Sequence, residues 1–95
     1  MLDVRRIKSK QLKLFARGVP SKVNPSWQAR IGRILSALNA AAQPAELDIP
    51  GFDFHRLIGD RKGTYAVKVS GNWRVTFRWD DDGPLAVDLE DYHGK

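Results

Sequence analysis

The sequence predicts an α+β domain in which a helical hairpin packs on a small, mostly antiparallel sheet, in the order β-α-α-β-β-β or with a fourth strand after the helices. Two observations support this fold class. Apolar residues recur at helical spacing through residues 27–42. Apolar and polar side chains alternate through residues 65–79 and again through residues 85–90, which is typical of half-buried strands. A chain of 95 residues has room for one domain, residues 1–95, with one two-layer core.

The first half of the chain predicts a short strand and two helices. Residues 2–7 alternate briefly and indicate the strand. Residues 8–17 predict a short basic helix, with Ser9 as its N-cap and Gly18 at its end. A longer helix opens at 24–25, where asparagine caps and proline takes the first position, and it ends before Pro44. Its expected core face holds Trp27, Ile31, Ile34, Leu35, Leu38 and Ala42.

The second half predicts the rest of the sheet. Residues 54–58 indicate a strand, and residues 59–63 indicate a tight turn into a β-hairpin over 65–79. A further turn over 80–84 leads to a final strand over 85–90. Each of these strands is expected to have one apolar face and one polar face, so the sheet has a side left for polar chemistry.

The register of the hairpin follows from matching its faces. A three-residue loop over 70–72 places Val69 opposite Trp73 and Lys68 opposite Arg74, whereas a two-residue loop would mix apolar and charged residues. Like charges in a cross-strand pair are mildly destabilising, so we expect an anion beside Lys68 and Arg74. A carboxylate from a neighbouring strand and a phosphate both satisfy this expectation.

The final strand supplies such a carboxylate. The same matching of faces predicts four cross-strand pairs: Trp79 with Leu85, Phe77 with Val87, Val75 with Leu89, and Arg74 with Glu90. Arg74 is then held between Lys68 and Glu90 without any ligand. An arginine held by a carboxylate can also be a preoriented phosphate clamp, because its fork keeps donors on the far edge.

Composition narrows the class of protein. The net charge is +5 and the sequence pI is about 9.9, which suit a partner such as RNA, DNA or an acidic protein. Basic residues dominate residues 1–45, whereas residues 80–91 carry only acids among their charges. The chain has no cysteine, which excludes disulfides and thiolate zinc sites. No apolar run is long enough for a membrane span or signal peptide, so we expect a soluble, cytoplasmic protein.

The basic residues of the two helices have two interpretations. Arg30 and Arg33 are expected to point away from the core face of the longer helix. A solvated helix face is the commoner explanation for such charges, and a surface that contacts RNA or another partner is the alternative.

The end of the chain, Glu-Asp-Tyr-His over 90–93, gathers groups that handle protons. Cleaving RNA without a metal needs a group that deprotonates a 2′-hydroxyl, a group that protonates the leaving 5′-oxygen, and a cation beside the phosphate. The first two roles fit four residues: His93, His55, Tyr92 and Asp91. Arg74 fits the third. Strict alternation puts His93 on the apolar side, so it joins Arg74 only if the strand ends or twists after Asp91.

Metal binding has little support in the sequence. Two distant histidines and no cysteine give no recognisable ligand spacing, so we expect no metal and no cofactor.

Three motifs together resemble a known family. They are Gly-Asp-Arg-Lys-Gly over 59–63, Asn-Trp-Arg-Val-Thr-Phe over 72–77, and Glu-Asp-Tyr-His over 90–93. In this order and spacing they resemble the HigB branch of the RelE-type bacterial toxins, also called plasmid-maintenance killer proteins. The likeness covers nearly the whole chain, from the early helix to the terminal tyrosine and histidine.

The resemblance implies both a fold and a function. It implies the RelE-like microbial ribonuclease fold, whose open sheet face receives RNA. It implies cleavage of messenger RNA in the decoding site of a translating ribosome, and restraint by a HigA-type antitoxin with a helix-turn-helix fold. Contact with operator DNA is expected only through that antitoxin.

The resemblance also assigns roles to residues. Arg74 is expected to stabilise the scissile phosphate and His93 to be the leading acid-base group, with Asp91 and Tyr92 orienting it or the nucleotide; His55 completes the set. This chain has Ile58 where similar toxins can carry a lysine. The cations expected to contact RNA are Lys68, Arg61, Lys62, Arg78, Arg30 and Arg33.

Two other functions fit the same residues. A non-enzymatic RNA-binding or ribosome-binding module would use the same basic surface. A ParE-type gyrase inhibitor would share the fold and act on a protein, although the Tyr-His ending favours the ribonuclease.

Overall fold

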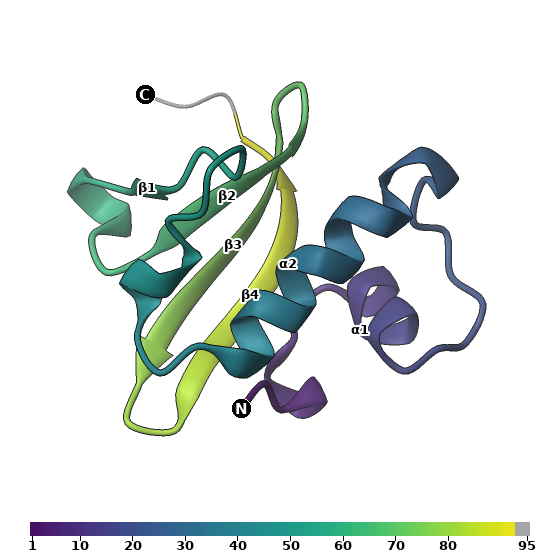
Figure 1. Ribbon diagram of the computed structural model, residues 1–95, viewed down its shortest axis with the longest axis horizontal. Helices are drawn as coiled ribbons and strands as arrows, with labels where there is room; N and C mark the ends of the chain where they lie inside the picture. Colours follow the sequence, from purple (N-terminus) through teal and green to yellow (C-terminus); the bar gives the residue numbers. More distant parts are fainter. Residues whose placement is uncertain (93–95) are drawn as a thin grey trace.

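The computed structural model, which describes residues 1–92, has two layers: helices on one side and a four-stranded antiparallel sheet behind them (Figure 1). The sheet order is β1-β2-β3-β4, the same as the order along the chain. The α-helices and strands are α1 (Lys10–Ala16), α2 (Gln28–Ala40), β1 (His55–Arg56), β2 (Tyr65–Ser70), β3 (Trp73–Asp80) and β4 (Gly83–Asp91). Short 3-10 helices lie between them: η1 (Val4–Arg6), η2 (Pro25–Trp27), η3 (Pro44–Leu47) and η4 (Gly59–Arg61). The α+β prediction is confirmed.

The expected strand over residues 2–7 is wrong, because the chain there turns into η1. The Asp3 side chain accepts a hydrogen bond from the backbone N–H of Arg5, at 2.9 Å, and this local capping favours a helical turn over an extended strand. What remains of the strand is a parallel bridge between Ile7 and Val87, which ties the start of the chain to β4.

The predicted caps of the two helices are confirmed, but both α-helices are shorter than predicted: α1 covers Lys10–Ala16 rather than 8–17, and α2 begins at Gln28, after η2, and stops at Ala40. The Ser9 side chain accepts from the backbone N–H of Leu12 at the start of α1, and Gly18, with φ of +75°, follows its end. Asn24 caps η2, which leads directly into α2. One core residue was misplaced: α2 stops at Ala40, so the extended chain buries Ala41 instead of Ala42.

The core lies between α2 and the helix-facing side of the sheet. From α2, three predicted core residues, Ile31, Ile34 and Leu38, are fully buried. From the strands they meet Val67, Val75, Phe77 and Val87, which are also fully buried. Trp27 is half-buried and packs at the edge of this core. No helix among the described residues is long and apolar enough to span a bilayer.

The β2–β3 hairpin has the predicted register away from its turn, where Val67 pairs with Val75 and Lys68 with Arg74. At the turn the prediction is wrong, because Ser70 rather than Val69 pairs with Trp73. The connection therefore has two residues, and a bulge at Val69 absorbs the extra one. The bulge keeps the apolar residues of both strands on the helix side.

The β3–β4 pairing is likewise confirmed at one end and wrong at the other. Arg74 lies opposite Glu90 and Val75 opposite Leu89, as predicted, but Trp79 lies opposite Pro84 rather than Leu85. A bulge near Ala86, which has φ of +51°, shifts the pairing by one residue. Neither glycine nor proline occupies positions 85–87, so no residue there signals a bulge.

The strand predicted over 54–58 is reduced to β1, a two-residue edge strand. Its neighbour Phe54 stacks on Tyr65, with ring centroids 5.8 Å apart. The Lys68 N–H donates to the Phe52 carbonyl at 2.7 Å, which ties the loop before β1 to β2. These contacts place His55 on the edge strand of the sheet.

Candidate active site

The side of the sheet that faces away from α2 carries two of the predicted catalytic residues, His55 and Arg74, in two neighbouring cross-strand rows. His55 pairs with Ala66, Ala66 with Thr76, and Thr76 with Asp88. In the next row Lys68 pairs with Arg74, and Arg74 with Glu90. Residues two apart on a strand share a face, so both rows lie on one surface, which we call the polar face.

Arg74 occupies the predicted backbone position, but its side chain has different partners from those expected. Its guanidinium donates to the backbone carbonyls of Gly71, at 2.7 Å, and Trp73, at 3.1 Å, and not to the Glu90 carboxylate. The expectation that Glu90 holds Arg74 is therefore wrong. The hairpin turn holds one guanidinium nitrogen, Nη1, and Nη2 and Nε make no hydrogen bond with the described residues.

Glu90 is instead bound by Arg61, which reaches it from η4. Two parallel hydrogen bonds of 2.8 and 2.7 Å join the Arg61 guanidinium to the two carboxylate oxygens, and the Thr76 hydroxyl donates to the same carboxylate. The bonds from Arg61 hold the pKa of the Glu90 carboxyl below its ordinary value, against the opposing effect of partial burial. Glu90 is therefore a fixed anion at neutral pH.

Tyr92 follows directly after β4 and stays attached to the hairpin. Its backbone N–H donates to the Asn72 carbonyl at 2.8 Å, and the Arg61 guanidinium carbon lies 5.8 Å from the centre of its ring. Asp91 ends β4 opposite Trp73. His93, the leading acid-base candidate from the sequence, lies outside the described residues.

His55 stands exposed on β1 with one ring nitrogen engaged. Its Nδ1 lies 2.8 Å from the backbone carbonyl of Asp53 and 3.7 Å from the carboxylate of the same residue. A carbonyl can only accept, so this contact places a proton on Nδ1, and in the neutral form of the ring Nε2 is then the acceptor. Asp53 has φ of +53°, a conformation that aspartate tolerates better than most residues. Asp53 is a neighbour that the sequence did not identify.

A pocket of about 280 Å³ opens on the polar face beside these residues. The cations that line it are Lys8, Arg61 and Arg78, and the anions are Asp60, Asp88 and Glu90. Thr76 lies at its base and is almost fully buried. Alternation along the strands could have identified Thr76 and Asp88, whereas Lys8 reaches the pocket only through the long-range bridge at Ile7.

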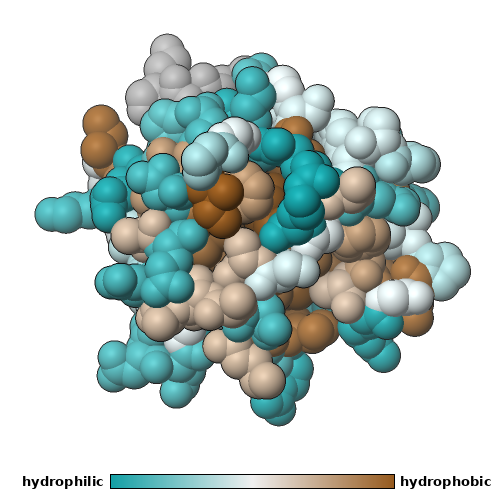
Figure 2. Space-filling model, in the orientation of Figure 1, coloured by the Kyte–Doolittle hydropathy of each residue, from teal (hydrophilic) through white to brown (hydrophobic). Residues whose placement is uncertain are grey.

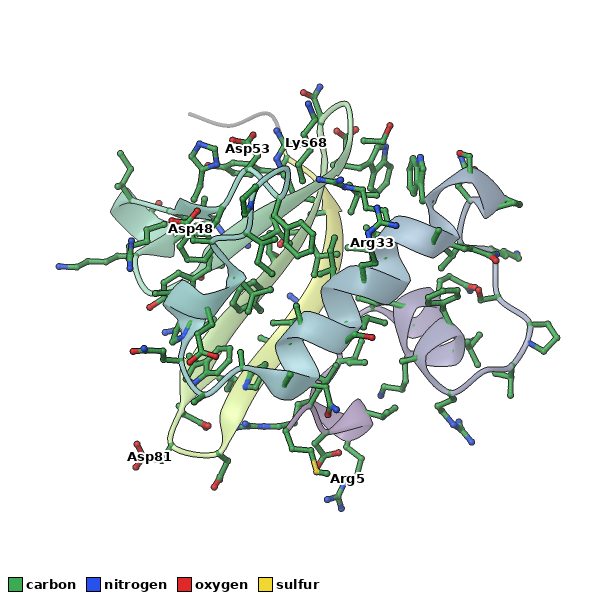
Figure 3. All side chains as sticks on the ribbon, in the orientation of Figure 1. Arg5, Arg33, Asp48, Asp53, Lys68 and Asp81 are labelled. Atoms are coloured by element: carbon green, nitrogen blue, oxygen red, sulfur yellow. The ribbon has the colours of Figure 1, made fainter. Side chains whose placement is uncertain are left out.

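The other predicted RNA contacts fall into two groups. Lys62, Lys68, Arg78 and Arg33 are exposed. Arg30 does not point away from the sheet: it donates to the carbonyls of Lys68, at 2.7 Å, and Gly51, and it lies over the Phe52 ring. Figure 3 shows Arg33 on α2 and Lys68 near the hairpin turn. Ile58, which stands where the resemblance suggested that a lysine can occur, is 76% exposed.

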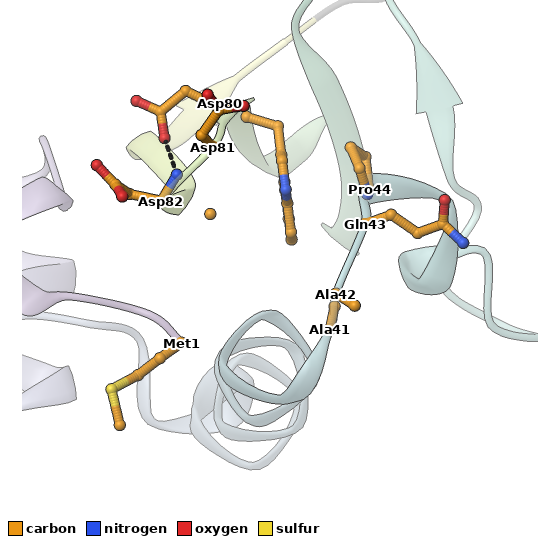
Figure 4. A pocket seen from close by; sticks show the side chains of 10 residues that line it. Met1, Ala41, Ala42, Gln43, Pro44, Asp80, Asp81 and Asp82 are labelled. Atoms are coloured by element: carbon orange, nitrogen blue, oxygen red, sulfur yellow. Dashed lines mark hydrogen bonds between the residues drawn. The ribbon is translucent and has the colours of Figure 1, made fainter.

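A second cavity, of about 430 Å³, lies at the far end of the sheet, around the β3–β4 turn (Figure 4). Its lining includes Met1, Pro44 and the aspartates at positions 80–82, and none of the predicted site residues. Residues 1–92 contain no group of three or more histidine, aspartate or glutamate side chains placed to hold a metal ion.

Comparison with known proteins identifies the family of the chain. Residues 5–93 match the family described as RelE-like toxin of type II toxin-antitoxin system HigB. The chain is also similar to Endoribonuclease HigB of Proteus vulgaris, with 36% identity over 91 residues that cover 95% of this chain and 99% of the relative. The chain therefore belongs to the HigB-like family of RelE-like toxins from type II toxin-antitoxin systems.

Proposed function

We propose that this toxin is a ribosome-dependent endoribonuclease that cuts messenger RNA in the decoding site and so inhibits translation. The observation that carries the proposal is the polar face, where two adjacent rows bring together His55, Lys68 and Arg74, with Tyr92 at the end of β4. The family assignment and the similarity to an endoribonuclease support the same activity.

The proposed chemistry is an in-line attack within the RNA strand. The 2′-oxygen forms a bond to the adjacent phosphorus, the bond from phosphorus to the 5′-oxygen breaks, and the products end in a 2′,3′-cyclic phosphate and a 5′-hydroxyl. A base accepts the 2′-proton and an acid donates a proton to the 5′-oxygen. His55, with Nε2 as an acceptor, is the described candidate for the base; His93, Tyr92 and Asp91 remain candidates for the other acid-base role.

Arg74 is proposed to stabilise the charge that develops on the phosphate. The hairpin turn fixes its Nη1, so Nη2 and Nε are oriented before the substrate arrives. Lys68, exposed beside it, and the exposed Arg33, Lys62 and Arg78 would attract the ribosome and its RNA. The upper edge of the molecule, where the hairpin turn lies, is mainly hydrophilic (Figure 2).

The partners follow from the same proposal. A type II toxin implies an antitoxin, and we propose that it is a HigA-type protein with a helix-turn-helix fold, through which alone the toxin meets operator DNA. We place the reaction in the cytoplasm, where translating ribosomes are, and it needs no metal or cofactor from the toxin.

The test is cleavage of a defined messenger RNA in a purified translation system. We expect cuts at codon-spaced positions only when ribosomes are present, with cyclic phosphate and 5′-hydroxyl ends. Arg74→Ala should lower the cleavage rate by about 100-fold, whereas Arg17→Ala, an exposed arginine outside the site, should not. Binding without cleavage would support an RNA-binding module, and trapped gyrase with intact messenger RNA would support a ParE-type inhibitor.

A further inference from the structure

We propose that Arg61 is a positioning residue for this site: its guanidinium, anchored on Glu90, holds the ring of Tyr92 and thereby sets the end of β4. The sequence suggested instead that Arg61 contacts RNA. Its effect on cleavage rests on the proposed function, whereas its effect on Tyr92 belongs to the free protein.

Arg61 connects two parts of the fold that are far apart in the sequence. It lies in η4, and its two bonds of 2.8 and 2.7 Å reach Glu90 near the end of β4. A fork of this kind fixes orientation as well as distance, because the planar guanidinium and the planar carboxylate must align. The η4 turn is thereby fastened to β4 on the polar face.

The carboxylate that anchors Arg61 is itself fixed. The Thr76 hydroxyl, almost fully buried on β3, donates to Oε2 of Glu90, the oxygen that also accepts from Nη2 of Arg61. The side chain of Glu90 is 24% exposed and that of Arg61 is 40% exposed, so both are partly shielded from water. Three residues from η4, β3 and β4 therefore form one rigid unit with no net charge.

Tyr92 is the residue that this unit holds. The Arg61 guanidinium carbon lies 5.8 Å from the Tyr92 ring centre, within the range of an attractive cation-π contact. The Tyr92 N–H donates to Asn72, at 2.8 Å, just beyond the last residue of β4. One backbone bond and one ring contact thus hold Tyr92 in place directly after β4.

The same contacts make Arg61 a poor candidate for a phosphate. Both of its terminal nitrogens bond to Glu90, whose negative charge cancels the field that would attract RNA. Lys68, by contrast, is exposed and makes no ion pair with the described residues. The positive charge that attracts RNA therefore comes from other cations on the polar face, such as Lys68, whereas Arg61 holds Tyr92 in position.

The test compares Arg61→Lys and Glu90→Gln with a matched control, Arg6→Lys. Lysine keeps the charge of Arg61 but has neither the planar fork nor the stacking surface. Arg6 makes an equivalent fork to Asp80, at the far end of β3. Two quantities are measured: the amide exchange rate of Tyr92 in the free protein by NMR, and single-turnover cleavage on ribosomes across a range of ribosome concentrations.

We expect Arg61→Lys and Glu90→Gln to speed Tyr92 amide exchange while the amides of central β3 stay protected. The maximal cleavage rate should fall by roughly 10-fold to 100-fold, with the half-saturating ribosome concentration changed by less than about threefold. Arg6→Lys should leave the cleavage rate and the Tyr92 amide unchanged.

Two results would overturn the inference. The first is an unchanged Tyr92 amide in Arg61→Lys. The second is a maximal cleavage rate in Arg61→Lys that equals the wild-type rate, even if more ribosomes are needed to reach it. A lysine would then be sufficient at this position, which would mean that only its positive charge is required. If the wild-type protein does not cleave at all, the proposed function fails, and Tyr92 exchange still decides whether Arg61 positions it.

Discussion

Two arginines on one helix should respond oppositely to the same substitution. Arg30 and Arg33 lie three residues apart on α2, and the sequence suggests the same role for both. In the structure Arg30 donates to two backbone carbonyls and covers Phe52, whereas Arg33 is exposed and makes no hydrogen bond or ion pair with residues 1–92. We therefore expect Arg30→Ala to unfold more easily than Arg33→Ala.

The magnitude follows from the contacts that are lost. A hydrogen bond from a charged donor contributes about 1.5–3 kcal/mol, and a cation-π contact at an exposed site about 0.5–1 kcal/mol. The freed carbonyls of Lys68 and Gly51 lie near the surface and can bind water, which reduces the total. We expect Arg30→Ala to lower the free energy of unfolding by about 2–3 kcal/mol, and Arg33→Ala to change it by less than about 0.5 kcal/mol.

The assay is urea unfolding followed by tryptophan fluorescence. For a small domain with an m-value of about 1–1.5 kcal/mol/M, the Arg30→Ala midpoint should fall by about 2 M while the slope stays the same. Arg30→Lys keeps one charged donor but loses the planar guanidinium, so its unfolding midpoint should lie between those of the wild type and Arg30→Ala. Equal midpoints for Arg30→Ala and Arg33→Ala would refute the reasoning, because the contacts of Arg30 would then contribute nothing.

The remaining predictions concern three other sites. Glu90 has a pKa below its ordinary value of 4.5, so its contribution to stability is fully present above that pH and is lost as the pH falls through the lower folded value. The stability deficit of Glu90→Gln should therefore shrink in acid, and a pH-independent deficit would contradict this. Ala86→Gly should stabilise the fold by up to about 1 kcal/mol in thermal unfolding, because φ of +51° strains alanine; a loss would be the opposing result. Ribosome binding should weaken with salt less steeply in Lys68→Gln: the slope of the logarithm of the binding constant against the logarithm of the salt concentration should be smaller by about 0.7–1. An unchanged slope would mean that Lys68 does not contact the RNA.

Local and periodic signals account for what the sequence predicted well. Ser9 and Asn24 cap helices through bonds to residues two or three positions away, so their roles can be recognised without the fold. Alternation along β2, β3 and β4 fixes which residues share a face, and it placed Lys68, Arg74 and Glu90 in one row correctly.

Side-chain partners across the fold could not be predicted in the same way. The Arg61 to Glu90 pair joins residues 29 positions apart, and the Arg30 bond to Lys68 joins residues 38 positions apart; no local pattern marks either. Matching the strand faces predicts that Glu90 binds Arg74, which lies opposite it, but the Glu90 carboxylate binds Arg61 from η4 instead. The bulges at Val69 and near Ala86 also lack a sequence signal. Alternation alone predicts an unbroken strand register at both places, whereas the observed register shifts by one residue.

The chemistry of the cut ends tests the central claim most directly. Messenger RNA from a purified translation system with this toxin should carry codon-spaced breaks that end in 2′,3′-cyclic phosphate upstream and 5′-hydroxyl downstream. Attack by the RNA's own 2′-oxygen, assisted only by side chains such as His55 and Arg74, gives these ends. Breaks that carry 3′-hydroxyl and 5′-phosphate ends, or breaks that form equally well without ribosomes, would contradict the account.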